Sequence, residues 1–225
     1  MDLIEQIKQN ARENKQRIVL PEGDEERTIK AAEYDIDYND NFMIDEYEIT
    51  INNEFITKEQ YNLNVVSEMI KEVYDVCSKN NVLFGVSPDG NMENNYEKVF
   101  ADVKRWCGNT GYIDFIMPQV YYGFYNEVKP FKMVVDEWEG IITNDKIKLY
   151  IALAFYKVGE VDKYAKSGKE EWVNNSDIIM REILMSRNLN KYEGFSLFRY
   201  DYIFNDSKYN AISTIEIENV KKILN

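Results

Sequence analysis

Nearly all-apolar segments of strand length alternate with amphipathic helical segments in this chain, and this alternation limits the fold more than any other feature. The expected strands are residues 82–86, 113–122, 149–155 and 195–198, with Pro118 interrupting the second. Strands without a polar face are typical of a parallel sheet that is covered on both sides. Helical connections then make right-handed crossovers. The pattern therefore predicts an α/β fold, either an open doubly wound sheet or a β/α barrel.

The expected helices carry apolar residues at helical spacing. Cys77, Cys107, Trp106 and Trp138 lie on these stripes, which indicates core packing and no role in a site. We expect Ser176 to cap the fourth helix, and Ser213 with Glu216 to form a capping box that opens the last one. The stripes cover residues 66–77, 96–107, 131–142, 179–184 and 213–224.

The amino-terminal part is organised differently. Residues 2–14 predict a short amphipathic helix, residues 17–20 a buried strand, and residues 25–32 the beginning of another helix. Residues 33–59 are acidic and rich in Asn, Asp and Tyr, so we expect them to be irregular.

Composition narrows the chemistry. The net charge is −13, with 40 acidic and 27 basic residues, which argues against nucleic acid or an anionic membrane as a partner. The chain has no histidine, which excludes Ser-His-Asp and Cys-His catalysis and His-ligated zinc. Two cysteines give no disulfide framework and no metal cluster. We therefore expect no metal and no cofactor, and acid–base work would fall to carboxylates, tyrosines or lysines.

The beginning of the sequence is charged and lacks a long apolar core, so it does not predict a signal peptide. No apolar run reaches transmembrane length. The expected location is cytoplasmic by default.

Residues 1–32 resemble the amino terminus of phosphate acetyltransferases. The resemblance rests on the segments Met1-Asp2-Leu3-Ile4, Arg17-Ile18-Val19-Leu20-Pro21-Glu22-Gly23, Glu25-Glu26-Arg27 and Ala31-Ala32. It implies a short α-β segment of residues 1–32 followed by an unrelated second domain of residues 33–225, as in a chimeric chain. No later segment continues the match, so no functional residue is carried over from that family.

Residues 34–205 resemble the glycosyl hydrolase-like family 10 domain, a group of carbohydrate-active β/α barrels. The motifs stand in order: Phe84-Gly85-Val86-Ser87-Pro88, Gly90-Asn91, Ile113-Asp114-Phe115-Ile116-Met117-Pro118-Gln119-Val120-Tyr121, Pro130-Phe131, Leu149-Tyr150-Ile151, Tyr156-Lys157, and Gly194-Phe195 to Phe198-Arg199-Tyr200. The resemblance implies the later four or five βα units of an eight-stranded barrel. A whole barrel usually needs about 250 residues. We therefore expect a partial barrel with an open edge and a tendency to self-associate.

In β/α barrels the site lies at the carboxyl ends of the strands. We expect substrate-binding roles there for Ser87, Gln119, Tyr121, Lys157 and Tyr200. Lys157 has the alternative of a lysine whose stem covers the rim of the barrel, and Arg199 and Tyr200 have the alternative of a surface role beside acidic residues. Asp114, at the beginning of a strand, is expected to be structural.

Glycoside cleavage needs two carboxyl groups that flank the scissile bond, and Asp40 and Asp89 are the candidates. The family's acidic pair follows a strand in a His-Phe-Asp-Asp-Tyr type segment. The nearest match here has Asp37 in place of His and Asn39 in place of the first Asp, and only Asp40 agrees. An amide can be neither base nor nucleophile, so this departure puts hydrolysis in doubt. The plain alternatives are a solvated loop acid for Asp40 and a turn residue for Asp89.

Three functional hypotheses remain open. The first is a domain that acts on carbohydrate as an O-glycosyl hydrolase, for which a second carboxylate within reach of Asp40, either Asp89 or Asp201, would be diagnostic. The second is a non-catalytic glycan-binding or relic domain, favoured by Asn39 and the weak segment after residue 33. The third, phosphate acetyltransferase, is suggested by residues 1–32 alone. The partner expected under the first two is a glycan, and the 17 tyrosines suit sugar stacking.

Overall fold

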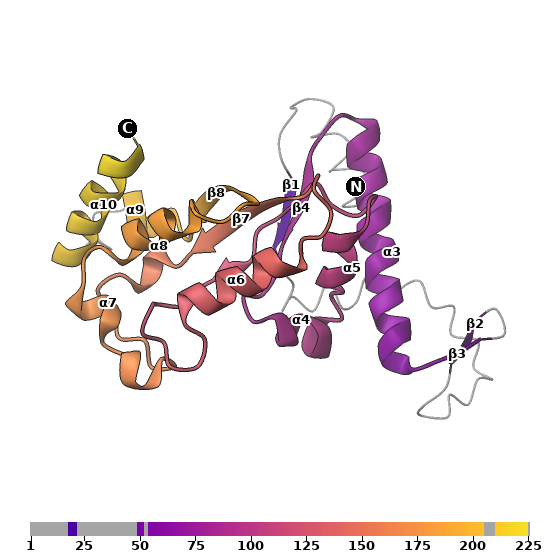
Figure 1. Ribbon diagram of the computed structural model, residues 1–225, viewed down its shortest axis with the longest axis horizontal. Helices are drawn as coiled ribbons and strands as arrows, with labels where there is room; N and C mark the ends of the chain where they lie inside the picture. Colours follow the sequence, from indigo (N-terminus) through magenta and orange to yellow (C-terminus); the bar gives the residue numbers. More distant parts are fainter. Residues whose placement is uncertain (1–17, 22–48, 52–53, 205–209, 225) are drawn as a thin grey trace. The chain divides into compact units, whose positions relative to one another are not determined.

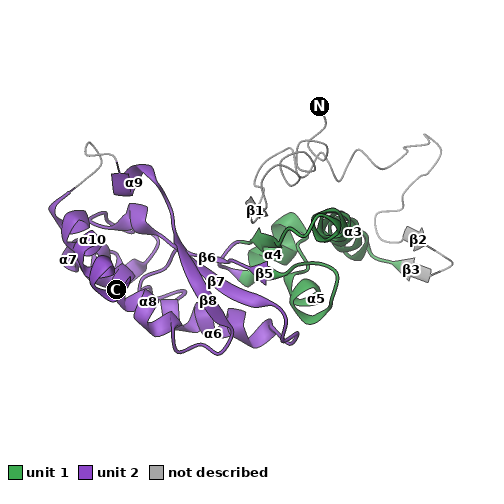
Figure 2. Ribbon diagram, turned by 90° about the horizontal axis from the view of Figure 1, so that it is seen from above, with its two compact units in different colours: residues 1–88, 92–114 green, residues 89–91, 115–225 purple. Residues whose placement is uncertain are grey.

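The computed structural model describes residues 18–21, 49–51, 54–204 and 210–224 (Figure 1). They belong to two compact units, each described here by itself (Figure 2). The first unit comprises residues 1–88 and 92–114, and the second comprises residues 89–91 and 115–225. The expected helices over 2–14 and 25–32 and the candidate Asp40 lie outside the described residues.

In the first unit, the strand expected near the amino terminus is present. Strand β1 (Ile18–Pro21) runs parallel to β4 (Phe84–Ser87), with Ile18 opposite Phe84. Asp114 holds the beginning of β4, because its carboxylate accepts a hydrogen bond from the Phe84 amide at 2.8 Å. This confirms the structural role expected for Asp114.

The long helix α3 (Lys58–Lys79) begins at Thr57 with a capping box, in which the Thr57 and Gln60 side chains each accept from the other's backbone N–H. It buries Ile70 and Cys77. Before it, β2 (Ile49–Ile51) and β3 (Glu54–Ile56) form a short antiparallel pair. The expectation that residues 33–59 are irregular throughout was therefore wrong for these two strands.

A single helix over 96–107 was also a wrong prediction. The structure has α4 (Met92–Val99) and α5 (Val103–Gly108), and between them Phe100 takes a positive φ of 51°. Asp102 begins α5, since its side chain accepts from the Arg105 amide at 3.1 Å. The apolar stripe nevertheless reaches the core, where Trp106 Nε1 donates to Ser67 Oγ at 2.9 Å.

The second unit is built on a parallel sheet, as predicted. Strand β7 (Lys148–Leu153) lies in the middle, with β5 (Phe115–Ile116) and β6 (Gln119–Val120) along one edge and β8 (Tyr192–Leu197) along the other. Pro118 divides β5 from β6 because it has no N–H to donate. Its carbonyl still accepts from the Ala152 amide of β7 at 3.0 Å.

Helix α6 (Phe131–Ile141) buries Phe131, Val134, Val135 and Trp138. Between β7 and β8 stand the short helices η1 (Phe155–Lys157), η2 (Lys166–Gly168) and α7 (Glu171–Asn174), and then α8 (Ile178–Ser186). After β8 come α9 (Asp201–Phe204) and α10 (Ala211–Leu224), and α10 packs on α8 (Figure 1). No helix among the described residues is long and apolar enough to cross a membrane.

Both expected helix caps in this unit were wrong. Helix α8 follows Asp177 in place of Ser176, and the Asp177 side chain makes no capping bond. Helix α10 begins after Asn210, whose side chain accepts from the Ser213 amide at 2.8 Å while Ser213 Oγ accepts from the Asn210 amide at 2.9 Å. The capping box is thus Asn210 with Ser213, and Glu216 is free to act elsewhere.

Candidate carbohydrate site

Four aromatic side chains gather where β6, β7 and β8 end, and we call them the aromatic cluster: Tyr121, Tyr156, Phe198 and Tyr202. Tyr121 stacks on Phe198, with ring centroids 5.6 Å apart and planes 25° apart. Tyr156 meets Tyr121 at 5.8 Å, Phe198 at 5.9 Å and Tyr202 at 6.3 Å, each time nearly edge to face. The Tyr156 amide also donates to the Phe198 carbonyl at 3.0 Å, which joins the ends of β7 and β8.

Tyr121, Tyr122 and Tyr156 keep their hydroxyl protons over the physiological range. Burial is the largest cause that raises the pKa of Tyr121 and Tyr156, and it raises the pKa of the neighbouring Tyr122 to about 12. A protonated phenol can donate and accept a hydrogen bond, and its ring offers an apolar face. The cluster therefore combines the two kinds of contact that a sugar ring needs.

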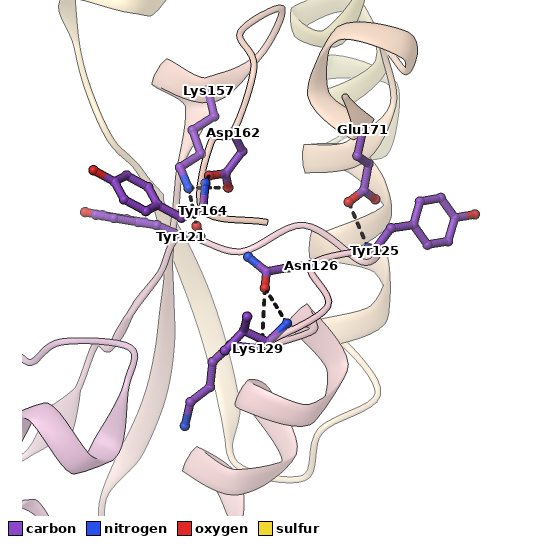
Figure 3. Close-up of polar contacts among 9 residues, drawn as sticks. Tyr121, Tyr125, Asn126, Lys129, Lys157, Asp162, Tyr164 and Glu171 are labelled. Carbon is purple, nitrogen blue, oxygen red and sulfur yellow. Dashed lines mark hydrogen bonds and ion pairs between the residues drawn. The ribbon is translucent and has the colours of Figure 1, made fainter. Parts of the chain in front are cut away.

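Lys157 is bonded to the backbone of Tyr121 and to the side chain of Asp162 (Figure 3). Its Nζ contacts the Tyr121 carbonyl and a carboxylate oxygen of Asp162, each at 2.7 Å. The second oxygen of Asp162 accepts from the Tyr164 amide at 3.1 Å, and only 2% of the Asp162 side chain is exposed. Lys157 thus connects the segment after β7 to the end of β6. The connection is its hydrogen bond to the Tyr121 carbonyl, which fixes the backbone of Tyr121.

Asp89 and Gln119 are neighbours, because a parallel bridge pairs them next to β6. Asp89 accepts from the Asn91 amide at 2.7 Å, as expected of an acid in a turn. Gly90 permits the approach: a Cβ placed there would lie 2.3 Å from the Gln119 carbonyl oxygen. Trp138 secures the turn from α6 by donating to the Gly90 carbonyl at 2.9 Å.

The other expected site residues are placed less centrally. Ser87 ends β4 in the first unit and is buried. Tyr200 is 74% exposed and does not belong to the aromatic cluster. Its ring contacts that of Phe204, with the ring centroids 4.7 Å apart. Of the expected residues, the structure therefore brings together Tyr121 with Lys157, and Asp89 with Gln119.

The carboxylates near the strand ends are occupied by structural bonds. Asp201 pairs with Arg199 at 2.8 Å. Glu171, 5% exposed, accepts from the Phe124 amide at 3.0 Å. It also accepts from the Tyr125 amide at 2.8 Å (Figure 3). Burial is the largest cause that raises the pKa of Glu171, and the two amide bonds oppose it. Together with Asp89 and Asp162, these acids are arranged as supports of loops.

Two further glutamates lie in the helical layer. Glu182 of α8 is fully buried, and desolvation by burial holds its pKa well above the usual range. Glu216 of α10 accepts from the Met180 amide at 2.9 Å, and burial raises its pKa to about 7. Within the described residues, no group of three or more His, Cys, Asp or Glu side chains could hold a metal ion.

Sequence reasoning placed Tyr156 at the end of a strand without giving it a role, and it missed Phe198, Tyr202 and Asp162 as members of this region. Phe198 stands directly after β8, so its position at the carboxyl end of a strand was a usable signal. Tyr202 and Asp162 stand in the segments that follow, and their place depends on how those segments fold back.

The comparisons with known proteins agree with this setting. The family model described as glycosyl hydrolase-like 10 matches residues 33–173. Glycosyl hydrolase DigH of Escherichia coli strain K12 is 27% identical over 180 residues, which cover 72% of this chain and 40% of that protein. Glycosyl hydrolase YngK of Bacillus subtilis strain 168 is 27% identical over 146 residues, covering 57% of this chain and 27% of that protein.

Among solved structures, the glycoside hydrolase domain of PgaB (BpsB) from Bordetella bronchiseptica aligns with a TM-score of 0.44 at 10% identity, over 70% of this chain and 43% of that one. The chain spans about two fifths of the length of DigH. The family match begins at residue 33, so it gives no support to the phosphate acetyltransferase resemblance of residues 1–32. Because the match covers well over half of the 225 residues, this chain belongs to the glycosyl hydrolase-like 10 family.

Proposed function

We propose that this protein binds a glycan at the carboxyl ends of β6, β7 and β8, with the aromatic cluster as its sugar-contacting surface. The observation that carries the proposal is the convergence of Tyr121, Tyr156 and Phe198 from three strand ends on one place. Phe198 is 44% exposed, so its ring is accessible to a ligand.

The setting supports a carbohydrate ligand over other classes. We infer that the parallel sheet of the second unit is part of a β/α barrel, in which ligands bind at the carboxyl ends of strands. The net charge of −13 disfavours polyanionic ligands. The relatives DigH and YngK are named glycosyl hydrolases, which gives a carbohydrate ligand a direct precedent.

O-glycosyl hydrolysis is a second candidate function. The observation in its favour is the position of the Asp89 carboxylate next to β6. This acid lies beside Gln119, and after burial its charge is the next cause that raises the pKa of the Tyr122 phenol. Hydrolysis would need a second carboxyl group, for which the proposal is Asp40. We place binding first because the described acids at these strand ends are engaged in structural bonds. The expected cytoplasmic location and the acetyltransferase hypothesis stay predictions.

Isothermal titration of the whole chain with cellohexaose, xylohexaose and chitohexaose tests the binding proposal. We expect at least one of these ligands to bind, and Phe198→Ala to weaken that binding about tenfold. Tyr164→Ala is the matched control, since Tyr164 is 86% exposed and does not belong to the aromatic cluster. A folded chain that binds none of the three, or that binds equally well without the Phe198 ring, would refute the proposal.

The same ligands and a panel of aryl glycosides test hydrolysis. Turnover by the native chain that disappears in both Asp40→Asn and Asp89→Asn would establish the second candidate. Turnover that survives Asp89→Asn would remove Asp89 from the mechanism.

A further inference from the structure

A cavity of about 370 Å³ opens in the second unit between the loop after β6 and the segment around α7. We call it the Tyr125 pocket. It shares no residue with the aromatic cluster, and its volume is within the range of small-ligand sites. Its lining consists of Tyr125, Ser167, Gly168, Glu170, Glu171, Asn174 and Asn175.

The floor of the Tyr125 pocket is built by close backbone packing. A Cβ at Gly168 would lie 1.9 Å from the Tyr125 carbonyl oxygen, so only glycine lets the two segments meet. The Glu171 carboxylate accepts from the Phe124 and Tyr125 amides, and Ser167 Oγ donates to Glu127 at 2.9 Å. These bonds hold the loop after β6 and the segment around α7 together, and they do not involve the Tyr125 ring or the side chains of Glu170 and Asn174.

The residues that line the pocket carry side chains of three kinds. Tyr125 presents an aromatic ring that is 64% exposed. Asn174 offers an amide and Glu170 a carboxylate, both exposed, and among the described residues no hydrogen bond or ion pair engages either side chain. Asn175 also lines the pocket; its Nδ2 donates to the Glu171 carbonyl at 2.8 Å, and its amide oxygen is of the kind that accepts hydrogen bonds.

These groups can make the contacts that a sugar residue offers, through both its hydroxyl groups and its C–H face. An apolar ring face covers the C–H face of a pyranose, a carboxylate accepts from hydroxyls, and an amide both donates and accepts. The lining has no lysine or arginine and carries two acids, so a phosphate, a sulfate or a uronic acid would meet repulsion without a partner.

We propose that the Tyr125 pocket is a second saccharide-binding site, which takes one sugar residue without an acidic group. The proposal rests on the function proposed above and adds to it a place and a charge selectivity. The loop after β6 carries both sites, with Tyr121 at its beginning and Tyr125 four residues later.

The experiment is isothermal titration of the whole chain with the three neutral hexasaccharides named above and with hexagalacturonate. The variants are Tyr125→Ala and Asn174→Ala for the pocket, Phe198→Ala for the aromatic cluster and Tyr164→Ala as the control. Circular dichroism and the thermal transition of each variant show whether it is folded. We expect both pocket variants to weaken binding of a neutral hexasaccharide about tenfold. We expect hexagalacturonate not to bind.

The outcomes separate the two proposals. Binding that falls with Phe198→Ala but stays unchanged in both pocket variants would overturn the pocket and leave the aromatic cluster. Binding that falls in the pocket variants but not with Phe198→Ala would support the pocket and overturn the cluster. Hexagalacturonate that binds as tightly as a neutral ligand and is lost with Tyr125→Ala would overturn the charge selectivity.

Discussion

Only 2% of the Asp162 side chain is exposed, and Oδ2 of its carboxylate lies 2.7 Å from Nζ of Lys157 in an ion pair. A buried charge that loses its partner is strongly destabilising, whereas replacement of both partners is much milder. The pair is therefore a structural link, and Lys157 acts on the candidate site through the Tyr121 carbonyl.

We expect Lys157→Met to lower the free energy of unfolding by about 3 kcal/mol, because Asp162 is then left without its cation. Asp162→Asn in the same chain should recover most of this loss. Chemical denaturation of the two single variants and the double variant measures the coupling. Strictly additive effects would show that the pair is not coupled.

Two glycines provide a matched pair of tests for close backbone approach. In Gly90→Ala the added Cβ would lie 2.3 Å from the Gln119 carbonyl oxygen, so we expect a loss of about 1–3 kcal/mol in unfolding free energy. In Gly140→Ala nothing lies within 4 Å of the new atom, and the residue is in α6. That variant should gain about 0.5–1 kcal/mol from helix propensity. Equal effects of the two in thermal denaturation would contradict the packing argument.

At the scale of elements, α8 and α10 are joined by a carboxylate in place of a local cap. Glu216 accepts from the Met180 amide in the first turn of α8, where amides lack partners within the helix. Burial raises the pKa of Glu216 from 4.5 to about 7, so the folded state holds a proton that the unfolded chain releases. This group therefore lowers stability as the pH rises from about 4.5 to 7, and its effect is constant beyond that range.

We expect Glu216→Gln to abolish this part of the pH dependence while its amide oxygen still accepts from Met180. Relative to the native chain, the variant should gain about 3 kcal/mol in unfolding free energy between pH 4.5 and pH 8. Urea denaturation at several pH values measures the difference. Glu218→Gln is the control on the same helix, because Glu218 is exposed and pairs with Lys221. Parallel profiles for native chain and Glu216→Gln would contradict the assignment.

The sequence predicted the elements that local chemistry defines. The four apolar strand regions, the break at Pro118 and the buried stripe of α6 were confirmed, whereas only Ile70 and Cys77 of the α3 stripe are buried. It failed where one pattern fits two arrangements. Ser213 could be the N-cap residue of a capping box with Glu216, or the N3 residue of one with Asn210 as the N-cap. The structure has the second arrangement, and Glu216 instead accepts from the Met180 amide of α8.

The candidate site likewise has residues whose positions could be predicted from the sequence and residues whose positions could not. Tyr121 and Lys157 follow strands, so their positions could be predicted, and the structure places them together. Asp162 and Tyr202 depend on the path of the segments after β7 and β8, which no periodicity encodes. The break at Phe100 was also hidden, since a helical stripe continues across it in the sequence.

At the scale of the whole molecule, the second unit has an incompletely covered sheet. Among the described residues β8 pairs with β7 alone, and its Phe195 and Leu197 are only half-buried. An open strand edge favours pairing with another chain. The sequence prediction of self-association keeps its physical basis and awaits measurement.

Sedimentation velocity over a range of concentrations tests it. The Phe198 amide donates to Leu153 of β7, so the Leu197 amide points away from β7, toward the open edge. We expect Leu197→Pro to reduce association, because it removes this outward donor. Leu197→Ala controls for the lost side chain. A native chain that stays monomeric at all concentrations would contradict the prediction.

The carboxylate that joins α10 to α8 has a consequence for where this domain can be cut. The family match ends at residue 173, before α8, β8 and α10. Yet β7, which lies inside the match, has β8 as its neighbour, and α8 depends on Glu216 for its first turn. A fragment trimmed to the matched region would keep β5 and β6 beside β7 but lose β8 from the other edge of this strand. The region that the family model matches and the region that folds together therefore have different borders in this protein.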